Sequence, residues 1–268
     1  EIQEEISRLS NEAWKDVERS RSLYSLAENV LLEELGLKDF KPQYRLSYTT
    51  GLSKAFRVHR IDAEYFQPIY DALVKNITDQ NHCFIRGIEV FNRRGVQPKY
   101  VENGEAKVVT SKHLGRISLD YEGLDATDLE EWRKNSDAQV SQFDTLIYTT
   151  GAYVGRTNCF LENHKALASN HINILRVREL NPIYVAVFLN SILGQMQVRR
   201  LVSGSAQVEL YPSDISKFVI WKAPSNIQRK IASLVQQSYG ARKKAKDLLQ
   251  EAKTKVEKAI ESCACTTK

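Results

Sequence analysis

Basic and polar side chains gather in this sequence where the chain is expected to turn, and such side chains bind phosphates and base edges. Residues 93–116 hold six basic residues and two acidic ones, a net charge of +4. We expect a phosphate-binding loop here, formed by Arg93, Arg94, Lys99 and Lys112. A basic loop that only faces solvent would have the same composition.

A hairpin with two glycines is the second candidate. Residues 143–160 alternate as two strands around a turn, and Gly151 and Gly155 permit a tight backbone path. An arginine near such a tip can bind guanine through two hydrogen bonds. The side chains expected there are those of Thr150, Tyr153 and Arg156.

A small polar loop, residues 203–207, is the third candidate. It follows a helix expected from Pro182 to about Val202. Ser205 and Gln207 lie in a glycine-containing loop, so they can approach a nucleic acid closely. Residues of this kind are also common where a helix ends.

Enzymatic chemistry has little support in the residue pattern. Residues 181–184 resemble the target-amine motif of amino-methyltransferases, but the motif's second proline is absent and Pro182 fits the start of a helix. The acidic residues of 120–134 are typical of a surface helix, and neither the histidines nor the four cysteines have metal-ligand spacing. We therefore expect free thiols and no metal site. Spacing says nothing about a catalytic triad, whose members need not be neighbours in sequence.

Composition indicates a globular, cytoplasmic protein. The chain has 268 residues, 42% of them hydrophobic, and a net charge of +5, which permits a polyanionic partner. It has no apolar run of membrane-spanning length and no signal-peptide pattern. Because it begins at Glu1 and its only methionine is Met196, we expect a piece of a longer polypeptide.

An internal repeat frames the chain. The first 35 residues return, divergently, at an offset of 225, so that Ile2-Gln3 matches Ile227-Gln228. Both copies space apolar residues by three and four, which predicts two long amphipathic helices. Residues 1–38 have a net charge of −4 and residues 229–258 a net charge of +6. We expect the helices to pair antiparallel, although a solvated charged face would also account for either helix alone.

The residues between the helices predict mixed α and β structure. We expect a loosely alternating segment at 44–58, a short helix at 69–76, strands at 83–91 and 107–110, and a turn at 92–95. The predicted fold class is therefore α+β: one mixed domain flanked by two long helices that form an antiparallel coiled coil.

In their order and spacing these features resemble the specificity subunit of type I restriction-modification enzymes. The resemblance spans nearly the whole chain and shows a single recognition domain, as in a half-length subunit or the C-terminal half of a full one. The segments that carry it are 22–37, Arg60-Ile61-Asp62-Ala63-Glu64-Tyr65-Phe66-Gln67-Pro68, the hairpin Gly151–Gly155, Ser203–Gln207 with Leu210, and the helix entry Pro224–Leu234.

The resemblance implies a division of the chain into four parts: a conserved helix (1–37), a target recognition domain (38–222), a second conserved helix (223–262) and a tail (263–268). The subunit would be a non-catalytic prokaryotic protein that reads a DNA half-site, while its helices dock methyltransferase subunits near Tyr24, Arg242 and Lys246.

The implied partners are double-stranded DNA, DNA adenine methyltransferase subunits, a restriction and translocase subunit, and a second copy of the chain, with no membrane. S-adenosylmethionine, ATP and Mg²⁺ would be bound by the partner subunits and no cofactor by this chain. Two other interpretations stay open: a coiled-coil adaptor without DNA specificity, and the non-catalytic recognition part of a DNA methyltransferase or nuclease fusion.

Overall fold

The computed structural model describes residues 2–204 and 208–265, and they form two compact units. One unit comprises residues 1–29 and 232–268, and the other comprises Val30–Ile231. The last turn of the first long helix and the first turns of the last one thus belong to the mixed unit. None of the helices in the described part of the chain combines the length and hydrophobicity of a membrane span.

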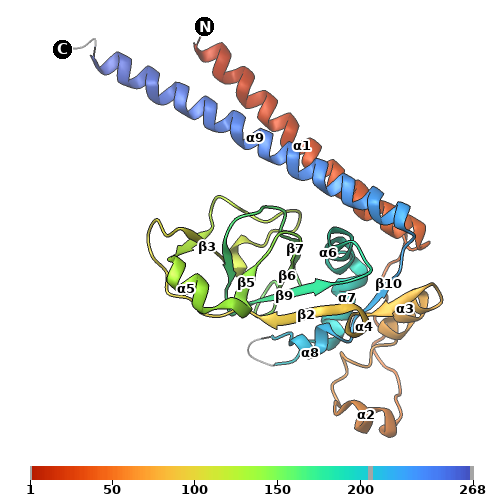
Figure 1. The fold of residues 1–268 in the computed structure, drawn as a ribbon. Helices are drawn as coiled ribbons and strands as arrows, with labels where there is room; N and C mark the ends of the chain where they lie inside the picture. Colours follow the sequence, from red (N-terminus) through yellow and green to blue (C-terminus); the bar gives the residue numbers. More distant parts are fainter. Residues whose placement is uncertain (1, 205–207, 266–268) are drawn as a thin grey trace. The chain divides into compact units, whose positions relative to one another are not determined.

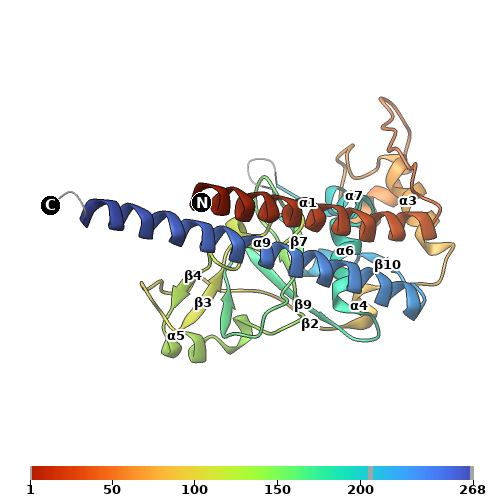
Figure 2. The same cartoon turned by 90° about the horizontal axis from the view of Figure 1, so that it is seen from above.

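The first unit is a pair of long helices, α1 (Ile2–Glu34) and α9 (Ser225–Cys265), which run side by side (Figure 2). Three contacts fix their direction: Lys255 Nζ lies 2.9 Å from Glu5 Oε1, Lys244 Nζ lies 2.9 Å from Asp16 Oδ2, and Ser238 bonds to Ser20. Residue numbers rise on one helix as they fall on the other. The predicted antiparallel pairing is confirmed.

Buried positions on both helices are spaced by three and four residues, although some apolar residues of the predicted stripe, such as Leu249 and Val256 on α9, are exposed. On α1 they include Leu9, Ala13, Asp16, Ser20, Tyr24 and Ala27, and on α9 they include Val235, Ser238, Ala245 and Ala252. Steps of three and four residues place all of these on one face of each helix. After α1, Gly36 has φ +66 and its N–H donates to Glu33 O at 2.9 Å, so a glycine in the left-handed region ends the helix.

The second unit is built on two four-stranded sheets (Figure 1). One sheet is antiparallel throughout and has the order β2-β9-β6-β7, with bounds Glu89–Arg94, Ile172–Val177, Thr145–Tyr148 and Thr157–Cys159. The other has the order β4-β3-β8-β5, with bounds Asp125–Thr127, Ala106–Val109, Ala166–Ala168 and Gln139–Val140, and its β3 and β8 are parallel. Side chains of both sheets, such as Leu146, Ile174 and Val140, share one core.

Helices surround these sheets. Seven short α-helices lie in the described residues of this unit: α2 (Leu52–Val58), α3 (Pro68–Thr78), α4 (Ile85–Ile88), α5 (Leu129–Lys134), α6 (Pro182–Asn190), α7 (Ile192–Leu201) and α8 (Pro212–Ile215). Two 3-10 turns, η1 (Ser111–His113) and η2 (Ser136–Ala138), and a two-stranded ribbon of β1 (His82–Phe84) and β10 (Val219–Trp221) complete the unit. The fold is α+β, as predicted.

Four local predictions were wrong in detail. The strand expected at 83–91 is divided by α4 into β1 and β2, which pair in different sheets. The helix expected at 182–202 is two helices, because Ser191 leaves the helical conformation and its side chain caps α7 by accepting from Leu193 N–H. The turn expected at 92–95 begins later, since pairing with β9 holds Asn92–Arg94 in β2. The loosely alternating segment at 44–58 contains α2 instead of a strand.

Candidate nucleic-acid interface

Four of the side chains singled out in the sequence meet at one edge of the β2-β9-β6-β7 sheet. In this sheet Arg94 lies opposite Asn173, and Tyr148 lies opposite Ile172. The carboxyl ends of β2 and β6 therefore share an edge with the amino ends of β9 and β7. Arg94, Thr150, Tyr153 and Arg156 lie at or just beyond this edge, which we call the recognition edge.

The turn after β6 has the tight path that its glycines predict. Gly151 and Gly155 have φ values of +102 and +90, a region that other residues rarely adopt. A Cβ on Gly155 would lie 2.8 Å from both methyl carbons of Val198, so the turn packs closely against α7. The side chain of Gln195 donates to Gly155 O at 2.8 Å and holds the turn on that helix.

Arg156 is presented by this turn with its guanidinium group over an aromatic ring. Its central carbon lies 3.6 Å from the ring centroid of Tyr153, a cation–π arrangement that restrains the guanidinium group. Among the described residues, no carboxylate forms an ion pair with Arg156, or with Arg199 on the exposed side of α7.

Arg156 and Arg199 line the same recess, which has a volume of about 350 Å³. Its other lining residues are Ala152, Tyr153, Val154, Gln195, Val198, Val202 and Val208. Aliphatic walls and two arginines without acidic partners make this recess a site for an anion or for an electron-rich base edge. We call it the arginine recess.

Arg94 and Thr150 have a different role from the one expected. Arg94 donates to Leu210 O at 3.0 Å, lies 3.8 Å from Glu209 Oε2 and stacks over Tyr211. Thr150 is 4% exposed and pairs through its backbone with Glu209. Because the Arg94 charge is balanced and the Thr150 side chain is covered, both residues support the segment at 208–211. Arg94 Nε and the Thr150 hydroxyl have no hydrogen-bond partner among the described residues, but both atoms are buried and not accessible to a ligand.

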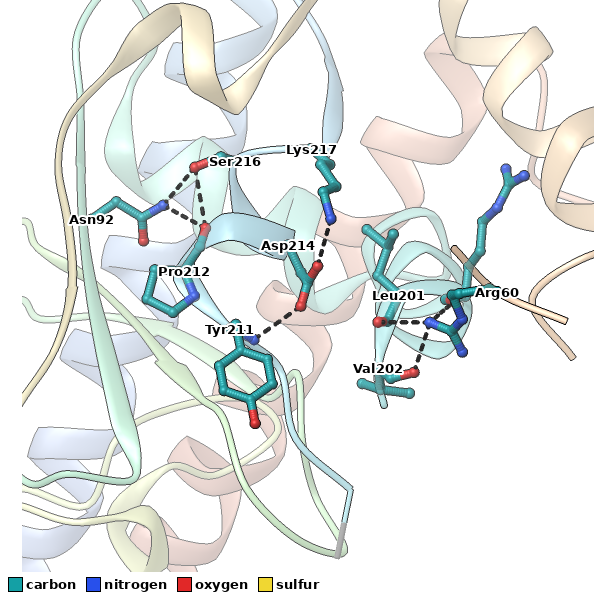
Figure 3. Close-up of polar contacts among 10 residues, drawn as sticks. Arg60, Asn92, Leu201, Val202, Tyr211, Pro212, Asp214, Ser216 and Lys217 are labelled. Atoms are coloured by element: carbon teal, nitrogen blue, oxygen red, sulfur yellow. Dashed lines mark hydrogen bonds and ion pairs between the residues drawn. The ribbon is translucent and has the colours of Figure 1, made fainter. Parts of the chain in front are cut away.

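The segment at 208–211 is fixed at both of its ends. Ser203 N–H donates to Glu209 O at 3.1 Å and Glu209 N–H donates to Ser203 O at 2.8 Å. Beyond it, α8 is capped by Asp214, whose carboxylate accepts from Tyr211 N–H and pairs with Lys217 (Figure 3). The candidates Ser205 and Gln207 lie outside the described residues.

Arg93, Lys99 and Lys112 lie away from the arginine recess. Arg93 points to the opposite face of β2 from Arg94 and forms an ion pair with Asp137. Lys112 pairs with Asp125 Oδ1 at 2.7 Å on β4, and Lys99 is exposed near the same strand, where its carbonyl accepts from the Thr127 hydroxyl. The predicted single basic loop is therefore wrong, because β3 carries the chain into the second sheet between these residues.

The candidate docking residues on the helix pair differ in accessibility. Tyr24 is only 7% exposed because it occupies the buried stripe of α1, so docking near it would use neighbouring side chains and stays a prediction. Arg242 and Lys246 are partly exposed and lie four residues apart on one face of α9. Docking at these two residues stays a prediction.

Comparison with known proteins gives similarity in structure only. No family model and no curated protein matches the sequence. The chain is similar to the crystal structure of an HsdS subunit from Thermoanaerobacter tengcongensis, with 13% identity and a TM-score of 0.44 over 96% of this chain and 56% of that one. It is also similar to a type I restriction-modification S subunit from M. genitalium, with 15% identity and a TM-score of 0.47 over 96% of this chain and 60% of that one. The chain thus spans a little over half the length of these two proteins.

Sequence reasoning missed two residues of the arginine recess, Arg199 and Gln195. Both lie on α7, a segment interpreted from its apolar residues alone. The consecutive Arg199 and Arg200 in its last turn were the available signal, since one of two adjacent helical residues must point away from the buried face. The described residues contain no cluster of three or more metal-ligating side chains.

Proposed function

We propose that this chain recognises sequence in double-stranded DNA through its recognition edge. The observation that carries the proposal is the arginine recess, in which the Arg156 guanidinium group lies over the Tyr153 ring and shares a hollow with Arg199. An arginine restrained by contact with a ring loses less conformational freedom when it binds, and its donors match guanine O6 and N7 or a phosphate. Arg199, at the exposed rim, suits the adjacent phosphate.

The finer part of the proposal is that the chain acts as a specificity subunit in a type I restriction-modification complex. It would read one half-site without catalysing a reaction, and its helix pair would dock DNA adenine methyltransferase subunits. The resemblance in sequence motifs supports this, as does a helix pair held by cross-helix ion pairs that can serve as a rigid spacer. Arg242 and Lys246 are the docking residues that we propose on α9.

DNA binding is tested by fluorescence anisotropy with a labelled duplex at several salt concentrations. The unchanged chain should bind with an affinity that falls steeply with salt, and Arg199→Ala should lower the slope of log affinity against log salt by about 0.9, the loss of one phosphate contact. Arg133→Ala is the matched control, because this exposed arginine lies on α5 close in sequence to Asp128, Glu130 and Glu131. Equal slopes for both variants would contradict the assignment of Arg199.

The role in a complex is tested by adding the methyltransferase subunit of the same system, S-adenosylmethionine and a randomised DNA pool. Sequencing the methylated positions should give one motif that depends on this chain. Methylation with no sequence preference, in a complex that contains the chain, would contradict the proposed role as its specificity subunit.

A further inference from the structure

Residues 41–61 form a projection from the second unit, which we call the arm. It carries α2 and extends away from both sheets beyond α3 (Figure 1). Several of its large apolar side chains are left exposed by the described residues. Those that are more than two-thirds exposed are Leu46, Leu52, Phe56 and Ile61.

The charge of the arm is of one sign. It contains five basic residues and no acidic one, with His59 in addition. Lys54 is paired with Asp71 and Arg60 with Asp62, both outside the arm. The other three are Lys41, Arg45 and Arg57, and none of them has a carboxylate partner among the described residues. Exposed apolar groups among uncompensated cations suit a polyanion that also offers apolar surface.

Several contacts hold the arm in place, so it is a built element. The side-chain amide of Gln67 accepts from Arg45 N–H at 3.1 Å and donates to Arg45 O at 3.0 Å. Lys54 Nζ lies 2.8 Å from Asp71 Oδ2 on α3. The backbone of Arg45 is therefore fixed while its charged group stays in solvent.

A further contact ties the arm to the arginine recess. Arg60 donates to the carbonyls of Leu201 and Val202, each at 3.1 Å, and to Arg200 O at 3.4 Å (Figure 3). These carbonyls end α7, the helix that carries Arg199, and Val202 itself lines the recess. The base of the arm thus lies beside the recess, and one ligand as long as a DNA duplex can reach both.

We propose that the arm is a second DNA-binding element beside the arginine recess. Arg45 and Arg57 neutralise phosphates of the duplex, and Phe56 packs against sugars and base edges in the minor groove, where proteins insert apolar side chains between flanking cations. The proposal rests on the proposed DNA recognition and extends it to residues that lie outside the recognition edge. Complementary charge favours duplex DNA over a protein partner.

The test compares variants of the full chain by anisotropy titration of a labelled duplex over a range of salt concentrations. Arg45→Ala with Arg57→Ala should lower the salt slope by about 1.8, two phosphate contacts at about 0.9 each. Phe56→Ala should reduce affinity at least roughly tenfold at every salt concentration and leave the slope unchanged, because it removes apolar burial and no charge. Val90→Ala, at another exposed apolar residue, and Arg133→Ala are the matched controls.

Three outcomes separate the arm from the recess. A lower salt slope for the double arginine variant and a lower affinity for Phe56→Ala support the arm as a DNA-binding element, provided that the control variants and the circular dichroism spectra are unchanged. If the arm variants bind DNA like the unchanged chain while Arg156→Ala binds more weakly, the arm's role is overturned and the proposed function stands. If the unchanged chain does not bind DNA at any salt concentration, both the proposed function and the arm's role are overturned.

Discussion

Ser238 on α9 donates its hydroxyl proton to the backbone carbonyl of Ser20 on α1 at 2.7 Å, and the two hydroxyl oxygens lie 3.0 Å apart. Both side chains are buried, so the two hydroxyls are satisfied only when these residues face each other. A polar pair inside an otherwise apolar seam can fix the register of two helices. We infer that this pair sets the alignment of α1 with α9.

Removing one hydroxyl of this pair should destabilise the helix pair. Ser238→Ala leaves the Ser20 hydroxyl without its buried partner, and we expect the free energy of unfolding to fall by about 1 kcal/mol. The double variant with Ser20→Ala should lose less than the sum of the two single losses, because it leaves no orphaned hydroxyl. Urea denaturation measures the free energy of unfolding of the two single variants and of the double variant. Strictly additive losses would show that the hydroxyls do not act on each other.

Arg156 should determine base preference more than overall affinity for the DNA backbone. Arg156→Ala should cost about 1–3 kcal/mol on the preferred sequence and much less on an unrelated duplex. Tyr153→Phe keeps the ring under the guanidinium group and should bind like the unchanged chain, while Tyr153→Ala should lose part of the preference. Competition titrations with matched and unrelated duplexes give these differences. An equal loss on every sequence would assign Arg156 to a phosphate instead.

Lys99 and Lys112 provide a contrast between a free and a paired cation. Lys99 has no carboxylate partner among the described residues, whereas Lys112 is paired with Asp125 at 2.7 Å. If DNA extends over the second sheet, Lys99→Ala should lower the salt slope by about 0.9, and Lys112→Ala should lower it less. Salt titrations of each variant make the comparison. Two unchanged slopes would restrict the interface to the recognition edge and the arm.

His113 should make stability depend on pH. It is 2% exposed, accepts from Thr110 N–H at 2.9 Å through Nδ1 and donates through Nε2 to Gly123 O at 2.7 Å. Burial lowers the pKa of His113 below its ordinary value of 6.5, because the charged ring would be poorly solvated. The unfolded chain therefore binds a proton more readily than the folded one.

The direction in which stability changes with pH follows from this difference in proton affinity. The contribution of neutral His113 is fully present above pH 6.5 and is lost as the pH falls through the lower folded pKa. Urea midpoints should drop between pH 7 and pH 5, and His113→Gln should remove part of that drop while lowering stability at pH 7. A variant with the same pH profile as the unchanged chain would show that other groups cause the dependence.

The spacing of apolar residues and glycines predicted the helices and the hairpin, which are elements that neighbouring residues determine. The two long helices follow from apolar spacing, and the β6–β7 hairpin follows from alternation around Gly151 and Gly155. The pairing of the helices followed from their opposite charges, which the Lys244–Asp16 and Lys255–Glu5 contacts now use, and its antiparallel direction followed from their places at the two ends of one domain.

The site was harder to predict because its members come from distant segments. Arg94 was expected to face a ligand, but Glu209, which is far away in sequence, balances its charge. Arg199 enters the recess only because Gly155 lets the hairpin pack on α7. The basic residues of 93–116 look continuous in sequence, yet strand pairing distributes them over two sheets. No local pattern contains this information.

Sequence recognition in DNA is the central claim, and selection from a randomised duplex pool tests it most directly. The full chain would be incubated with the pool at moderate salt, and the bound duplexes recovered, amplified and sequenced over several rounds. We predict enrichment of one short motif, which Arg156→Ala broadens at a single position while Arg133→Ala leaves it unchanged. Retention of DNA with no enriched motif, or the same motif from both variants, would contradict recognition through the arginine recess.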